Sequence, residues 1–353
     1  MKLISFFGQP EGPPLNIKAV ADKAGVSVAT VSRVMNHPEL VTEETREHIL
    51  SVMKKMNYTP NWFARNIQSA RTGMIGLLVH DFLDPSNMEI AKGVEAIAHQ
   101  KGYHVMLCNT EFNPVKEKEY IDTLIERKID GLILTSTTLK NSDLDKMKKQ
   151  GANYVLVGKN KTINRQNIVY TDYKTATEEA ITYLITLGRT RIGLVLGEFP
   201  KPEIEEKLEG YKRALKEGGI PFDESLVYQA ENNIEGGYLA ASKMLDDKID
   251  IDAVFASTDQ MALGVMDKLK SAGVHIPEDI ALIGFDDLRV GALVEPKLTT
   301  ISKPMYRMGL MAARLLFDII EGDGVDEIQE IALQSKLKIR KSCGNKGRLK
   351  EIW

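Results

Sequence analysis

The stretch "AVADKAGVSVATVSRVMN", residues 19–36, predicts two short helices separated by a tight turn. Apolar residues recur at helical spacing from Ile17 to Ala24, and the next residue, Gly25, suits the left-handed conformation that ends a helix. Ser27 can cap a second helix that runs to about Met35. Two helices joined by a short turn around a glycine form a helix-turn-helix.

The second helix carries small and β-branched polar residues on its outer side, where a helix that faces water would carry Lys and Glu. Val31 and Val34 form its buried side. Two explanations fit this composition. The segment is either an ordinary packed helical hairpin or a pair of helices whose outer face fits closely into a partner, such as a DNA groove.

A third helix is predicted within "EETREHILSVMKKMNY", residues 43–58, with Thr42 as its N-cap. Glu43 and Glu44 lie in the first turn, where the helix dipole favours negative charge. The inward positions of this helix are apolar: Ile49, Val52, Met53 and Met56. The three helices together predict a small all-helical head.

The pattern changes after residue 58. Pro60 favours a boundary, and the stretch 61–68 is too short to form a stable helix alone in water, so we expect it to fold only against a partner. From Met74 onward, apolar runs alternate with amphipathic helical stretches; the runs are "MIGLLV", "HVMLC", "GLILTS", "NYVLVG", "RIGLVLG", "DAVFAS" and "IALIGFDD". This alternation predicts an α/β core of parallel sheets in two lobes, divided near "VYTDYKTATEEA".

Composition and charge limit the function classes. The 353 residues are 43% hydrophobic, enough for two or three domains with cores of their own. The N-terminal apolar run stops at Gly8 and the two cysteines have no metal-binding spacing, so we expect a cytoplasmic protein. Residues 1–73 carry nine Lys or Arg and six Asp or Glu, a charge of +3, whereas the rest of the chain carries −6. A basic head has the sign that nucleic-acid binding requires.

Catalytic signatures are missing from the sequence. It contains no GxGxxG, GxSxG or HExxH pattern, and "VGKN" at residues 157–160 lacks the first glycine and the final Ser or Thr of a phosphate-binding loop. We therefore predict neither an enzyme nor a metal or cofactor site.

Five stretches together resemble bacterial transcription regulators of the LacI family: "NIKAVADKAGVSVATVSRVMN", "YTPNWFAR", "STDQMALG", "IPEDIALIGFDD" and "PKLTTISKPMYRMG". The resemblance implies a helix-turn-helix head at 16–59 and a hinge helix with its linker at 60–72. It also implies an effector-binding core of periplasmic-binding-protein type I fold at 73–342, whose lobes are joined by three crossovers. We expect the N-lobe at about 73–170 and 303–322, and the C-lobe at about 171–302 and 323–342.

The resemblance also implies DNA contacts. Val28 and Ala29 would meet base edges, Thr30 and Ser32 phosphates, and Arg33 a guanine. Ser27 and Asn36 complete the expected recognition surface. In the family the hinge helices of two subunits meet in the minor groove, where Phe63 would touch its counterpart and Ile67 would enter the central base step. We therefore expect a homodimer on a palindromic operator with a central CpG step.

The expected effector cleft departs from the family pattern. Asp172 and Asp259 match family positions in the cleft, whereas Ser86, Asn87 and Asn232 stand where many members have aromatic residues. Lys207 replaces the usual ligand-binding Arg. With Lys159, these polar residues favour a small anionic effector, such as an anionic sugar derivative. Each lysine is equally compatible with an ordinary surface charge.

Three alternatives remain at this stage. Lys207 and "GYKRALKEGGIP" resemble the catabolite control protein A branch, which uses a phosphoprotein corepressor, although Glu295 stands where that branch is basic. The second alternative is a solute-binding or receptor domain of the same fold without DNA binding. The third is an enzyme of the two-lobed fold, for which the sequence offers no nucleophile or acid–base cluster.

Overall fold

A computed structural model describes residues 16–58, 71–159, 163, 165–198, 201–322 and 327–344. The chain divides into two compact units, one ending at Thr72 and the other beginning at Gly73. Most of the predicted hinge at 60–72, including Phe63 and Ile67, lies outside the described residues.

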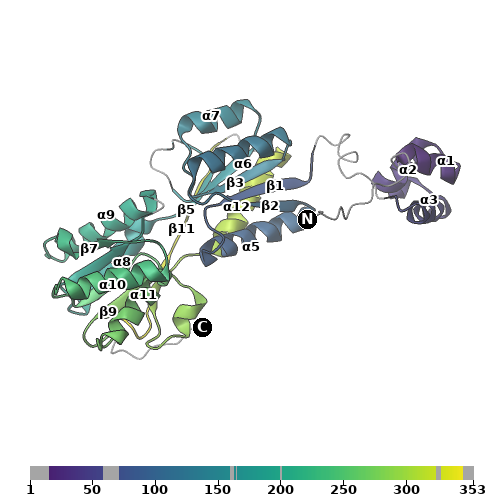
Figure 1. The fold of residues 1–353 in the computed structure, drawn as a ribbon. Helices are drawn as coiled ribbons and strands as arrows, with labels where there is room; N and C mark the ends of the chain where they lie inside the picture. The colour runs from purple at the N-terminus through teal and green to yellow at the C-terminus, as the bar shows by residue number, and fades with distance from the viewer. Residues whose placement is uncertain are drawn as a thin grey trace, which may run out of the picture. The chain divides into compact units, whose positions relative to one another are not determined.

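The described residues of the first unit form three α-helices, α1 (Ile17–Ala24), α2 (Val28–Asn36) and α3 (Glu43–Lys55), with a short 3-10 helix η1 (Pro38–Leu40) before α3 (Figure 1). Gly25 adopts the left-handed conformation at φ 67°, and its N–H donates to the Ala21 and Asp22 carbonyl oxygens of α1. The Ser27 hydroxyl accepts a hydrogen bond from the Thr30 N–H at 3.1 Å. These local features confirm the predicted helix-turn-helix.

A small apolar core holds the three helices together. Val20, Val31 and Ile49, one from each helix, are fully buried, and the His48 side chain joins α3 to the Ala24 carbonyl oxygen at 3.2 Å. Thr42 occupies the predicted N-cap position, but its hydroxyl donates to the Thr45 hydroxyl at 2.9 Å instead of accepting from a backbone N–H.

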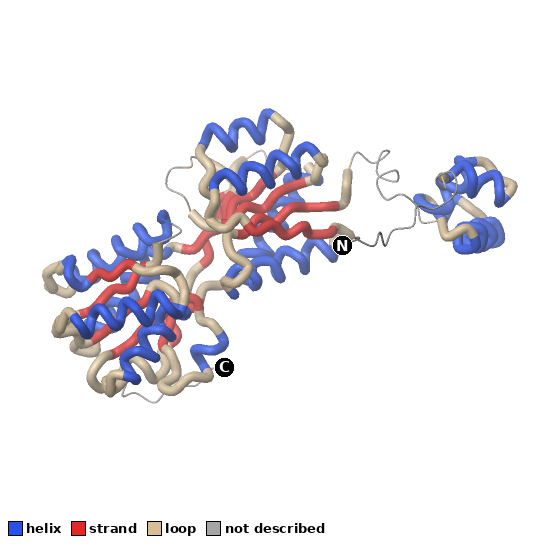
Figure 2. The backbone as a smooth tube through the Cα atoms, in the orientation of Figure 1, coloured by secondary structure: helices blue, strands red, loops and turns tan. Residues whose placement is uncertain are grey.

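The second unit consists of two lobes, each built around a six-stranded sheet (Figure 2). The first sheet is parallel, in the order β11-β5-β4-β3-β1-β2. Its strands are β1 (Met74–Val79), β2 (His104–Asn109), β3 (Gly131–Thr135), β4 (Tyr154–Val157), β5 (Ile168–Thr171) and β11 (Glu330–Leu333). Helices α5 (Pro85–Gln100) and α12 (Met305–Glu321) pack on one face of this sheet through an apolar cluster. Helices α6 (Pro114–Glu126) and α7 (Asn141–Lys149) pack on the other face through a second apolar cluster.

The second sheet has the order β12-β10-β9-β8-β6-β7, and within it only the β10–β12 pair is antiparallel. Its strands are β6 (Ile192–Leu196), β7 (Val227–Gln229), β8 (Ala253–Ala256), β9 (Ala281–Asp286), β10 (Thr299–Ser302) and β12 (Lys336–Lys338). Its faces are covered by the pairs α8 (Tyr173–Thr186) with α9 (Lys201–Glu217), and α10 (Ile234–Asp246) with α11 (Asp259–Ser271). Short 3-10 helices η2 (Glu224–Leu226) and η3 (Arg289–Ala292) complete this lobe.

Three chain segments cross between the lobes: β5 to α8, β10 to α12, and β11 to β12. The first and third lie side by side, with the Thr171 and Ser335 hydroxyl oxygens 2.7 Å apart. This arrangement corrects the expectation that residues 323–342 all belong to the C-lobe. β11 pairs with β5 because Ile331 and Leu333 pack against the apolar core of the first lobe. The third crossover therefore lies between Leu333 and Lys336.

Candidate functional site

The outer face of α2 is the first candidate site. Val28, Ala29 and Arg33 are exposed there, and Thr30 and Ser32 are half-buried, whereas Val31 and Val34 are buried beneath them. The hydroxyl oxygens of Ser27 and Thr30 lie 2.8 Å apart, so these two side chains also fix the start of the helix. The Asn36 side chain lies outside what the structure describes. A face with one long cationic side chain among short ones can approach a nucleic acid closely.

The second candidate site is a cleft between the two lobes of the core, with about 620 Å³ of space that is partly open to solvent. The ends of the parallel strands form it, as expected for open α/β sheets. Polar lining residues from the first lobe are His80, Asp84, Ser86, Asn87, Thr135 and Ser136; those from the second lobe and the crossovers are Tyr173, Glu203, Lys207, Asn232, Ser257, Thr258, Asp286 and Lys303. Both lobes therefore present polar groups to anything bound there.

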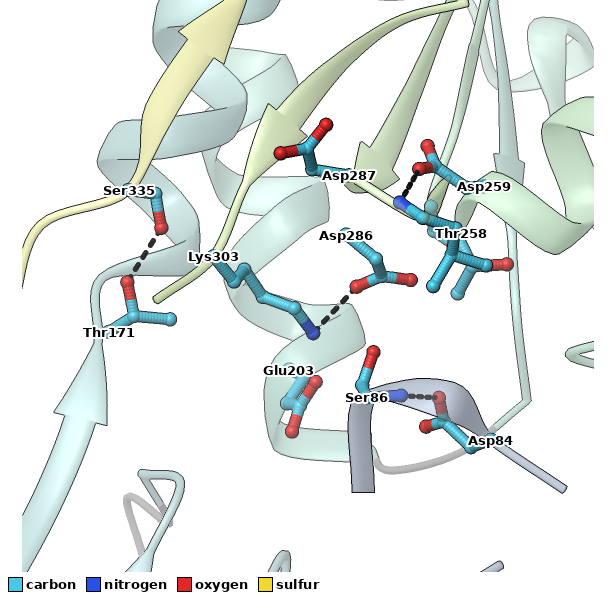
Figure 3. A network of polar contacts seen from close by, with 12 residues as sticks. Asp84, Ser86, Thr171, Glu203, Thr258, Asp259, Asp286, Asp287, Lys303 and Ser335 are labelled. Carbon is cyan, nitrogen blue, oxygen red and sulfur yellow. Dashed lines mark hydrogen bonds and ion pairs between the residues drawn. The ribbon is translucent and has the colours of Figure 1, made fainter. Parts of the chain in front are cut away.

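A buried ion pair lies in the cleft wall. The Lys303 Nζ is 2.6 Å from the Asp286 carboxylate, and each side chain is only 7% exposed (Figure 3). Burial opposes the charge on Lys303, but Asp286, Tyr173 and Glu203 together raise its pKa well above the usual value. Lys303 is therefore a cation that already has a carboxylate partner.

Lys207 is almost completely buried beside this pair. Its Nζ donates to the Ser257 carbonyl oxygen at 2.9 Å and lies 4.4 Å from the centre of the Phe285 ring. Burial lowers the pKa of Lys207 to about 8. Because its ammonium group is held by protein groups on two sides, Lys207 is poorly placed to neutralise a bound anion.

Two further carboxylates line the cleft from opposite lobes. Asp84 accepts a hydrogen bond from the Ser86 N–H at 2.9 Å and lies 3.6 Å from His80 Nε2. Glu203 accepts a hydrogen bond from the Ser136 hydroxyl at 3.0 Å, which joins the second lobe to the first. Burial raises the pKa of Asp84, but the contact with His80 and the charge of Lys303 more than offset this, so its pKa lies below the ordinary value.

Among the residues that the structure describes, the lining has more negative than positive groups. Asp84, Glu203 and Asp286 face the cleft with two cations, Lys207 and Lys303. Within the described ranges, no group of three or more His, Cys, Asp or Glu side chains could hold a metal ion. This charge balance weighs against the anionic effector that the sequence indicates.

Four of the six predicted effector residues line the cleft: Ser86, Asn87, Lys207 and Asn232. The Asn232 side chain packs against the backbone of Gly197 so closely that a Cβ atom there would lie 1.5 Å from the amide oxygen. Because Gly197 has no side chain, Asn232 can take its position in the lining.

Asp259 is not part of the lining, contrary to the sequence expectation. Its side chain is fully buried behind the wall, where it accepts hydrogen bonds from the Thr300 hydroxyl at 2.6 Å and from the Leu288 N–H at 2.7 Å. Burial and the nearby charge of Asp286 raise the pKa of Asp259 to about 7. Thr258, one residue earlier, faces the cleft instead, because Asp259 is the first residue of α11 and its side chain points back into the lobe.

Asp172 also lies outside the lining. It is the N-cap of α8 and accepts hydrogen bonds from the N–H and hydroxyl groups of Thr175, at 3.0 and 2.8 Å. Lys159, which the sequence grouped with Lys207, lies over the Tyr170 ring at 4.9 Å from its centre and does not line the cleft either. Both side chains have local partners that account for their positions.

Sequence reasoning missed the groups that dominate the cleft: Asp84, Glu203, Asp286 and Lys303. Two of them lie within quoted motifs, Asp286 in "IPEDIALIGFDD" and Lys303 in "PKLTTISKPMYRMG", so a signal was present. Aromatic surface was also missed. Tyr173 lines the cleft, and His80 stacks on Phe112 in an adjoining recess with ring centres 4.2 Å apart.

Comparison with protein families decides the relationship. The family of bacterial regulatory proteins of the lacI type matches residues 16–61. The periplasmic binding proteins and sugar-binding domain of the LacI family match residues 72–341. The chain belongs to the LacI family. It is a DNA-binding transcriptional regulator with an effector-binding core, and the alternative of a solute-binding protein without a DNA-binding head is wrong.

Full-length relatives agree with this assignment. Catabolite control protein A of Priestia megaterium is 33% identical over 329 residues, which cover 93% of this chain and 99% of the relative. The ribose operon repressor of Halalkalibacterium halodurans is 32% identical, with 92% of this chain and 96% of the relative covered. The relatives of this LacI-family chain thus include a catabolite control protein and an operon repressor.

Solved structures share the fold. The transcriptional regulator CelR in complex with cellobiose is 30% identical, with a TM-score of 0.72 and coverage of 93% of this LacI-family chain and 99% of that one. The lac repressor dimer bound to operator and an anti-inducer has a TM-score of 0.83 over 94% of this chain and 99% of its own, but at 24% identity it supports the fold alone. In the part of the chain that the structure describes, no helix is long and apolar enough to span a membrane.

Proposed function

We propose that this regulator binds a palindromic operator as a homodimer and that a small, uncharged, polyhydroxylated effector in the cleft changes its operator affinity. The DNA contacts would be those predicted on and near α2: Ser27, Val28, Ala29, Thr30, Ser32, Arg33 and Asn36, with Ile67 from the hinge. Such a protein has no need of catalytic groups and would work in the cytoplasm, where the DNA is.

The charge balance of the cleft carries the effector proposal. Lys303 is paired with Asp286 at 2.6 Å and Lys207 is held by the Ser257 carbonyl oxygen at 2.9 Å, while Asp84 and Glu203 add negative charge. The carboxylates of this network can accept hydrogen bonds from the hydroxyl groups of a sugar, and the ammonium groups can donate hydrogen bonds to them. A bound anion would instead be repelled by three carboxylates. The relative solved with cellobiose is consistent with a sugar.

Operator affinity would respond because the effector contacts both lobes. A ligand shifts a conformational equilibrium by the difference between its affinities for the two states, and side chains from both sides of the cleft provide that difference. The effector proposed here replaces the anionic one that the sequence favours, and Ser86, Asn87, Lys207 and Asn232 remain its proposed contacts together with Asp286 and Lys303.

Matched pairs of sugars test the charge of the effector. We expect D-ribose, D-glucose or cellobiose to raise the melting temperature of the full chain by mass action, and D-ribose 5-phosphate and D-gluconate not to do so. The shift should disappear in Asp286→Asn but persist in Asp246→Asn, an exposed carboxylate on α10. Stabilisation by the two anions in preference to the neutral sugars would overturn the proposal and restore the anionic effector.

A further inference from the structure

Two consecutive aspartates at the end of β9 have unusual backbone conformations. Asp286 has φ 124° and Asp287 has φ 64°, values that residues other than glycine rarely adopt. Such strain persists only where surrounding contacts hold it, and it concentrates at ligand sites and switch regions.

The two carboxylates point in opposite directions (Figure 3). Asp286 lines the cleft and pairs with Lys303. Asp287 faces away from the cleft. One of its carboxylate oxygens is 2.6 Å from the Arg340 guanidinium. The other is 2.6 Å from Lys338 Nζ and accepts a hydrogen bond from the Ser302 hydroxyl at 2.8 Å. One short, strained segment therefore has contacts on both sides of the cleft wall.

These partners lie next to the segments that join the lobes. Ser302 ends β10, and Lys303 follows it at the start of the second crossover, which leads from β10 to α12. Lys338 ends β12, the first strand after the third crossover. The third crossover in turn touches the first through the Ser335 and Thr171 hydroxyls at 2.7 Å (Figure 3). Asp287 thus contacts the strand that leads into the second crossover and the strand that follows the third, and the third crossover contacts the first.

We propose that Asp287 is a positioning residue that couples the state of the cleft at Asp286 to the angle between the lobes. This rests on the proposed function, in which an effector in the cleft acts by moving the lobes. Because Asp286 and Asp287 share a peptide bond in a strained conformation, a change in the contacts of one carboxylate moves the other. Asp287 then shifts the second and third crossovers together, since it binds Ser302 on one and Lys338 beyond the other.

The surroundings of Asp287 fit such a role. Its side chain is 13% exposed and that of Arg340 17%, so both charges are shielded from water and salt. Burial raises the pKa of Asp287, but the hydrogen bonds from Lys338, Arg340 and Ser302 lower it more, so the group stays ionised and keeps its three partners at neutral pH. Arg340 also donates to the Leu298 carbonyl oxygen at 2.7 Å, which fixes the guanidinium to the sheet.

A double-mutant cycle on the distance between the lobes tests the coupling without DNA and without an effector. Spin labels on cysteines introduced at Lys149 on α7 and Lys216 on α9, both exposed, would report that distance by pulsed electron paramagnetic resonance. We expect Asp286→Asn to shift or broaden the distance distribution by about 2 Å in the full chain, the size of shift typical of such switches. The same substitution should have less than half that effect when Asp287→Asn is also present.

Controls separate coupling from simple loss of structure. Asp279→Asn, an exposed aspartate of the same lobe, should leave the response to Asp286→Asn unchanged. If Asp287→Asn does not fold, Lys338→Met takes its place, since that side chain is 43% exposed and its loss leaves Arg340 and Ser302 on Asp287. Additive effects of the two substitutions, or no effect of Asp286→Asn, would overturn the proposal. Failure to bind an operator would instead count against the proposed function and leave this result standing.

Discussion

Replacing Lys303 by Met should lower the stability of the core by about 3 to 5 kcal/mol at neutral pH, the range found when one partner of a buried ion pair is removed. The substitution keeps the length of the side chain but leaves the Asp286 carboxylate, itself only 7% exposed, without its cation at 2.6 Å. Urea unfolding of the full chain, followed by circular dichroism, measures the loss.

The double variant Lys303→Met/Asp286→Asn is the matched control, because it removes the uncompensated charge. We expect it to recover most of the stability, since neutral pairs of similar shape are tolerated where single charges are not. If the Lys303→Met variant is as stable as the parent, then Asp286 finds another partner or takes up a proton at no cost in stability. The ion pair would then make no net contribution to the stability of the core.

Arg33→Ala should weaken binding to the cognate operator by about 1 to 3 kcal/mol, roughly 5- to 150-fold, and affect random DNA far less. Arg33 is the long cationic side chain on the exposed face of α2, beside Val28 and Ala29, and a bidentate contact with guanine is the commonest specific use of Arg. Titration of labelled duplexes at fixed salt concentration measures both affinities.

Arg46→Ala is the matched control for this prediction. The Arg46 side chain is 42% exposed and belongs to the same unit as Arg33. It lies on α3, where it pairs with Glu43. We expect little change in the ratio of specific to nonspecific affinity. Equal losses on cognate and random DNA for Arg33→Ala would mean that Arg33 meets only phosphate.

Local signals were sufficient to predict the helix-turn-helix. Gly25 and Ser27 act within one turn of their own positions, so the sequence determines the end of α1 and the start of α2 directly. All seven apolar runs likewise form strands, and six of them are central, because continuous apolar sequence is typical of strands buried on both faces; the run "HVMLC" forms the edge strand β2. Short edge strands such as β7 and β11 lack that signal: β11 alternates exposed and half-buried residues.

The cleft could be predicted only in part, because its lining depends on where each side chain points at the end of a strand. Thr258 and Asp259 are adjacent in sequence, yet the first faces the cleft and the second is buried behind it. Lys207 was recognised as a cleft residue, but its bond to the Ser257 carbonyl oxygen joins residues fifty positions apart and has no local signal. The charge of the effector depends on the partners of each lysine in the folded protein, so the sequence alone is not sufficient to predict it.

Selection of binding duplexes from a random DNA library by the full chain tests whether this protein recognises an operator. We expect enrichment of one palindromic sequence of about 14 to 18 base pairs with a CpG step at its centre, because two heads would occupy neighbouring major grooves on either side of a paired hinge. Recovery of unrelated sequences, or of a single half-site without symmetry, would contradict it.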